Sequence, residues 1–129
     1  MAKQVDALQA FLTADLNIEK DVAIRRLKTS LRIKAIDSAT LERAREQATN
    51  GGRKERTVDA DKFKAVLVTK MVTNVDFGND GMLTKYGAAN NVDCVRKALL
   101  PGEIERIVNE GLALSGFADE DETIEEIKN

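Results

Sequence analysis

The chain has 129 residues, enough for one domain with a substantial core, and 43% of them are hydrophobic, which is sufficient for folding. Its single cysteine excludes an internal disulfide and a zinc site made of several thiolates, and the absence of histidine excludes Ser-His and Cys-His catalytic pairs. A net charge of −2 argues against nucleic-acid binding by the chain as a whole.

The charge is spread unevenly along the chain. Residues 20–56 contain eleven Lys or Arg against five acids, a net charge of +6, whereas residues 101–129 contain nine acids against two cations, a net charge of −7. No apolar run approaches the roughly 18 residues of a membrane span, and the first ten residues lack the apolar stretch of a signal peptide. We therefore expect a soluble protein of a reducing, cytosolic compartment.

The first predicted element is a short amphipathic helix that ends near Asn17. Residues at helical spacings carry its apolar face: Val5, Leu8, Phe11, Leu12 and Leu16.

Residues 22–35 change to a period of two, which predicts a two-stranded hairpin with a basic outer face. Val22 and Ile24 alternate with polar or small residues, as do Leu31 and Ile33, and residues 28–30 lie between the two runs. The turn lacks Asn-Gly or Asp-Gly, so a single helix over residues 18–36 is the competing interpretation.

Two further helices follow. Asp37 and Ser38 suit the N-cap of a helix that should end at residues 50–52, followed by a flexible basic loop over 51–56. Asp59 or Asp61 should cap the next helix, whose predicted buried stripe is Phe63, Val66, Leu67 and Met71.

Two shorter helices are expected next, one over DGMLTKYG with Asp80 as its cap and one over NVDCVRKALL with Asn91 as its cap. The last helix begins at Pro101, the only proline, because the first helical N–H has no partner within the helix. Gly116 suits the left-handed position after its end, so that Phe117 folds back on Leu112. Its stripe is Ile104, Ile107, Val108, Gly111, Leu112 and Ser115.

Candidate chemistry is sparse. DFGNDGMLTKYG resembles a calcium loop, with Asp76, Asp80 and Gly81 in place, but Gly78 and Gly87 stand where carboxylates are needed. A structural turn is therefore favoured over a metal site. Cys94 lies on an apolar face with no base or metal partner in the sequence, so we expect a buried structural thiol. We expect no catalytic residues, no cofactor and no metal.

Several segments share a pattern when they are taken in order: SATLERAREQAT, GGRKERTVDADKFKAVLV, NVDFGNDGMLTKYGA, LLPGEIERIVNEGLALSGF and the acidic end in EEIKN. In this order they resemble one family, the XkdN-like tail assembly chaperones of long-tailed phages and prophages, and the likeness covers about residues 20–129. The most specific parts are D-F-x-x-D-x-x-L-x-x-Y-G from Asp76 to Gly87, and L-L-x-G-E-I followed by L-S-G-F. The chain departs from the family at Val75 and Gly81, where members often have proline.

The resemblance implies a non-enzymatic protein in the cytoplasm of the bacterial host, absent from the mature virion. Its expected partner is the tape measure protein, which it would keep soluble while tail tube subunits assemble around it; the tail tube protein is a further possible partner. A small nucleic-acid-associated regulatory protein using the basic residues 25–56, and a generic protein-interaction adaptor, are the alternatives.

The sequence thus predicts a mainly α-helical α+β fold with about five helices and a small β-hairpin near the N-terminus. Residues 1–117 should form a single domain, and residues 118–129 an acidic, frayed tail. Exposed patches on the hairpin face and the last helix are the candidate partner surfaces, and the residues expected to bind the partner are Arg25, Arg26, Arg32 and Lys34.

Overall fold

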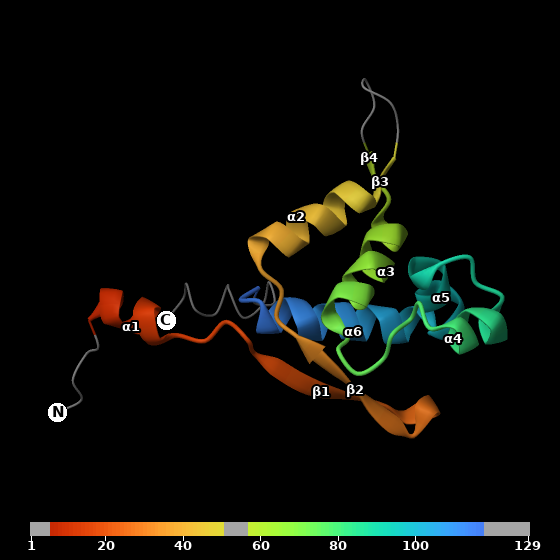
Figure 1. The fold of residues 1–129 in the computed structure, drawn as a ribbon, viewed down its shortest axis with the longest axis horizontal. Coiled ribbons are helices and arrows are strands. Elements are labelled where there is room, and N and C mark those ends of the chain that lie inside the picture. The colour runs from red at the N-terminus through yellow and green to blue at the C-terminus, as the bar shows by residue number, and fades with distance from the viewer. Residues whose placement is uncertain (1–5, 51–56, 118–129) are drawn as a thin grey trace, which may run out of the picture.

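The computed structural model describes residues 6–50 and 57–117 and confirms a mainly helical α+β fold with a hairpin near the N-terminus (Figure 1). The helices are α1 Ala7–Thr13, α2 Ser38–Gln47, α3 Ala60–Met71, α4 Asp80–Tyr86, α5 Asn91–Ala98 and α6 Pro101–Leu114. Antiparallel pairs are formed by β1 Glu19–Ile24 with β2 Thr29–Lys34, and by β3 Thr49–Asn50 with β4 Thr57–Val58.

The core is organised around α3. Its residues Ala65, Val66, Leu67 and Val68 are all fully buried, as is Met71, so this helix is covered on several sides and not only along one stripe. Helices α2, α5 and α6 all pack against it. The predicted stripe is correct for Val66, Leu67 and Met71, whereas Phe63 is only half-buried.

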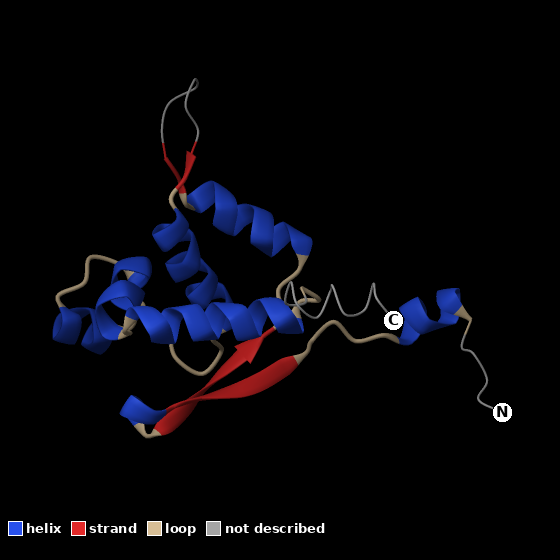
Figure 2. Ribbon diagram, turned by 180° about the vertical axis from the view of Figure 1, so that it is seen from behind, coloured by secondary structure: helices blue, strands red, loops and turns tan. Residues whose placement is uncertain are grey.

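The hairpin is present, which rules out the single helix over residues 18–36. Val22 pairs with Leu31 and both are buried on the inner face, together with Ile24 and Ile33. The strands are joined by the 3-10 turn η1 (Arg25–Leu27), which ends at Lys28 in the left-handed conformation with φ of 56°. The paired strands lie along one side of the helices (Figure 2).

Three predicted helix boundaries need correction. Helix α2 ends at Gln47 because Thr49 and Asn50 pair as strand β3 with β4. Asn79, and not Asp80, caps α4: its side chain accepts hydrogen bonds from the backbone N–H groups of residues 81 and 82. Asn90, and not Asn91, caps α5 by accepting from the N–H of residue 93. In both cases two adjacent residues had suitable side chains, and the earlier one has the extended backbone that a cap needs.

Other predicted ends are confirmed. Asp37 and Asp59 cap α2 and α3, and Pro101 begins α6. Gly116 takes a φ of 97°, and the N–H groups of Gly116 and Phe117 donate to the carbonyls of residues 113 and 112, the hydrogen-bond pattern of a Schellman ending.

Helix α1 is shorter than the predicted helix and stands apart from residues 19–50 and 57–117, here called the body (Figure 1). None of its residues is buried, and none belongs to the core cluster. The predicted loop over residues 51–56 and the acidic tail over 118–129 lie outside the described residues. The single-domain boundary at residue 117 therefore stays a prediction.

Gly111 allows α6 to approach α3 closely. A Cβ atom at this position would lie 2.2 Å from Met71 Sδ and 2.8 Å from its Cε, and Met71 is fully buried, so the methionine has little room to move. Gly102 lies in the same helix, and no atom is within 4 Å of the Cβ that it lacks. The two glycines therefore differ in packing while sharing the helical backbone.

We predict opposite effects of alanine at these two positions. Gly102→Ala should not destabilise the protein, because alanine favours the helix and meets no neighbour. Gly111→Ala should be less stable than Gly102→Ala by about 1–3 kcal/mol, the usual cost of overpacking a core. Urea unfolding followed by circular dichroism measures the difference. Equal free energies of unfolding for the two variants would show that α3 and α6 make room for the added methyl group without cost.

Candidate partner-binding surfaces

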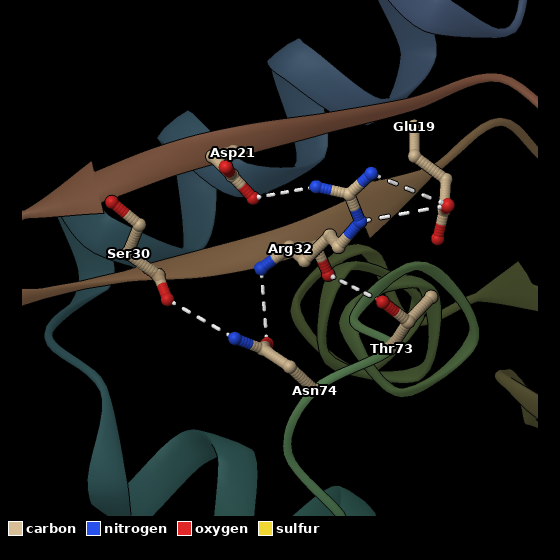
Figure 3. Close-up of polar contacts among 6 residues, drawn as sticks. All are labelled: Glu19, Asp21, Ser30, Arg32, Thr73 and Asn74. Carbon is tan, nitrogen blue, oxygen red and sulfur yellow. Dashed lines mark hydrogen bonds and ion pairs between the residues drawn. The ribbon is translucent and has the colours of Figure 1, made fainter.

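The four cations expected to bind a partner all lie on or beside the hairpin, but two of them are engaged within the chain. Arg32, in β2, projects from the outer face, where its guanidinium is 3.2 Å from an oxygen of Asp21 and 3.5 Å from one of Glu19 (Figure 3). Both acids lie on the neighbouring strand β1. These ion pairs are exposed, so each contributes little to stability.

The backbone of Arg32 is also engaged, by the segment that follows α3. The Arg32 N–H donates to the side-chain oxygen of Asn74 at 2.9 Å, and its carbonyl accepts from the N–H of Thr73 at 2.8 Å. The Asn74 amide donates to the Ser30 carbonyl at 3.1 Å (Figure 3). These bonds cover the free edge of β2 and attach the hairpin to the end of α3.

Arg26 attaches the hairpin turn to the start of α6. Its Nε and Nη2 donate to the two carboxylate oxygens of Glu103 at 3.0 and 2.7 Å, and Nη2 also donates to the Ala98 carbonyl at 2.9 Å. One Glu103 oxygen also accepts from the Leu100 N–H at 2.8 Å, across the first turn of the helix. Hydrogen bonds from Arg26 hold the pKa of Glu103 below its ordinary value. We infer that Arg26 chiefly positions the turn.

The other two cations are less constrained. Neither Arg25 nor Lys34 forms an ion pair within residues 6–50 and 57–117, and both are exposed. The hairpin face is nevertheless not uniformly basic, because Glu19 lies opposite Lys34 and Asp21 opposite Arg32. Alternating charge of this kind does not favour a nucleic-acid backbone, which selects clustered cations.

A second surface is apolar. Nine large hydrophobic side chains are exposed in the described residues, and five of them fall within 11 residues near the N-terminus: Leu8, Phe11, Leu12, Leu16 and Ile18. Ile18 is joined to the body because its carbonyl accepts from the Ala35 N–H at 2.8 Å. Ile36 in turn donates to the Ser115 side chain, near exposed Phe117 at the end of α6. Most of the exposed large apolar residues therefore lie in or just after α1, or follow α6, whereas Leu27, Val58 and Leu100 lie in other parts of the chain.

Sequence reasoning identified the helical spacing in this segment but not its exposure. The same pattern of Leu8, Phe11 and Leu12 would suit a helix packed on the core, and nothing in the sequence distinguishes a covered apolar face from an open one.

Cys94 and the Asp76 loop, which the sequence also singled out, have the following surroundings. Cys94 is fully buried, as expected, and burial raises the pKa of its thiol. In the predicted structural turn, the Asp76 side chain accepts from the Gly78 N–H at 2.9 Å. Among residues 6–50 and 57–117, no group of three or more Cys, Asp or Glu side chains is placed to hold a metal ion. No helix in the same ranges is long and apolar enough to cross a membrane.

Fold and surface together define a small, mainly helical α+β domain with an exposed apolar segment near its N-terminus. A family model of the phage XkdN-like tail assembly chaperones matches residues 8–128, so the chain belongs to this family.

Among solved structures, a crystal structure of the protein YqbN, a structural genomics target, is similar with a TM-score of 0.64. The alignment covers 89% of this chain and 100% of that one at 17% identity, which shows a shared fold. A comparison with curated proteins gives no match.

The Arg26–Glu103 contact predicts an acid-dependent loss of stability. Because the folded-state pKa of Glu103 is lowered, its contribution is present above the unfolded value of about 4.3 and is lost as the pH falls through the folded-state pKa. Glu103→Gln keeps a side-chain oxygen that can accept from the Leu100 N–H, but it has no carboxylate charge to lose. Between pH 5 and 3 (an approximate range that brackets the glutamate pKa), the free energy of unfolding should fall more steeply in the wild type. Urea unfolding at several pH values measures this, and free energies of unfolding that fall equally in the wild type and in Glu103→Gln would contradict the prediction.

Proposed function

We propose that the protein binds the tape measure protein of its phage and keeps it soluble while the tail tube assembles. Membership of the tail assembly chaperone family supports a role in building the tail. The observation that carries the proposal is the group of exposed apolar side chains near the N-terminus of an otherwise charged domain. A chaperone needs such a surface to cover apolar segments of its client, and charged surroundings keep the complex in solution.

The remaining parts of the proposal follow from this role. The protein acts by binding and not by catalysis, in the cytoplasm of the bacterial host, and it leaves before the virion is complete. The tail tube protein is a second partner, which meets the chaperone when tube subunits replace it on the tape measure. The hairpin cations of Arg25 and Lys34 contribute to these contacts by attracting acidic groups of a partner.

Co-expression tests the proposal directly. The tape measure protein of the same phage should be largely insoluble alone, and should become soluble and co-purify when the chain is present. A matched control replaces the chain with an unrelated acidic protein of similar size, which should have no effect. A tape measure protein whose solubility does not respond to the chain would overturn the proposed function.

The contribution of the hairpin is tested by removing charge without disturbing the fold. Arg25→Gln with Lys34→Gln should weaken binding of the tape measure protein several-fold, mainly by slowing association, with a larger effect at low salt. Arg43→Gln with Arg96→Gln removes the same charge from exposed positions on α2 and α5 and should leave binding unchanged. Surface plasmon resonance at two salt concentrations makes the comparison; identical kinetics for both double variants would place the partner away from the hairpin.

A further inference from the structure

Residues 6–18, here called the N-terminal arm, have large apolar side chains that are exposed instead of packed in the core. Phe11 is 83% exposed and Leu16 is 81% exposed, and no residue of α1 is buried. In an α-helix, residues three and four apart share a face, so Leu8, Phe11 and Leu12 form one continuous apolar face of α1. Among the described residues, none of this face belongs to the core cluster.

The arm is also too short to be a stable helix by itself. Helix α1 has seven residues, and an isolated helix of fewer than about 12 residues is marginal in water because nucleation is unfavourable. Neither of its ends has a side-chain cap: Asp6 precedes the helix but makes no capping hydrogen bond, and Ala14 follows it. The helix therefore gains most of its stability when its apolar face is covered.

The charges of the arm restrict what covers it. Asp6 and Asp15 are its only charged side chains, and they lie near the two ends of α1. Complementary charge favours a partner whose apolar surface is bordered by lysine or arginine. The Asp15 carboxylate accepts from the Asn17 N–H at 2.8 Å, which fixes one of these charges in the segment after α1.

The arm of a second copy is a poor partner for this arm. Two arms that pair side by side bring Asp6 against Asp6 or against Asp15, depending on their direction, and like charges at a desolvated contact oppose association. The arm offers no cation with which to neutralise them. Its occupant is therefore better sought in a different protein.

We propose that the apolar face formed by Leu8, Phe11 and Leu12 docks on an amphipathic helix of a different protein, whose apolar stripe is bordered by Lys or Arg. The inference rests on the proposed function, under which that helix belongs to the tape measure protein. Leu16 and Ile18 extend the contact toward the body, where the hydrogen bond from Ala35 to Ile18 anchors the arm. Under this proposal the body holds the arm in place, and the arm contacts the client.

A pair of neighbouring substitutions tests the docking face. Phe11→Asp places a charge on the apolar face, and Ala10→Asp places the same charge one residue earlier, on the opposite side of α1. Both positions are exposed and neither belongs to the core, so the thermal stability of the two variants should be the same. Phe11→Asp should weaken co-purification of the tape measure protein at least about tenfold, whereas Ala10→Asp should retain wild-type binding.

The charge of the partner is tested with two designed peptides that share a leucine stripe and differ only in lysine or glutamate beside it. The wild type should bind the lysine peptide more tightly, and Asp6→Asn with Asp15→Asn should abolish this preference while keeping a side-chain oxygen for the Asn17 N–H. Equal binding of both peptides by the wild type would overturn the inference that Lys or Arg borders the partner's apolar stripe.

The remaining outcomes separate this inference from the proposed function. Wild-type binding of the tape measure protein that survives Phe11→Asp overturns the docking face and leaves the chaperone function standing. Absence of wild-type binding overturns both. A wild-type dimer that Phe11→Asp converts to a monomer in analytical ultracentrifugation, with client binding unchanged, would assign the arm to a second copy and overturn the proposal.

Discussion

The burial of α3 is the constraint on which the rest of the structure depends. Four consecutive residues, from Ala65 to Val68, are fully buried, so the helix needs neighbours on several sides at once. Small residues allow these neighbours to approach: Ala44 from α2 is fully buried, and Gly111 of α6 leaves room for Met71. The hairpin then packs on α6 and is tied to the end of α3 by the backbone of Arg32, so its position also follows from α3.

Local patterns predicted the elements well because each depends on neighbouring residues. Pro101 and Gly116 mark the ends of α6 through their own backbone preferences, and the alternation of Val22, Ile24, Leu31 and Ile33 identifies the hairpin. The same reasoning missed Ala65 and Val68, because a helical period selects one face while α3 is covered on several. It also placed two caps one residue late, where adjacent residues competed for one role.

The candidate surfaces were harder to predict because they depend on contacts between distant residues. A charge count makes residues 20–56 basic, but Arg26 is paired with Glu103, 77 residues away, and Arg32 with Asp21 on the adjoining strand. Helical spacing likewise identifies the apolar face of α1 without revealing that no described element covers it. The sequence therefore predicts which side chains are available for binding less well than it predicts which ones form helices.

Different residues stabilise the body and form the apolar surface of the arm. The body is stabilised by a core to which α1 contributes nothing, and the hairpin cations Arg26 and Arg32 are held by carboxylates of the same chain. Burying the arm's apolar side chains in a partner would release free energy of the same kind that folding releases in the core, at about 25 cal/mol per Å² removed from water. Because that free energy would be gained only in the complex, we expect the arm's residues to affect binding more than folding. Under the proposed docking, an exposed apolar arm outside the core would therefore allow client affinity to change without loss of the fold.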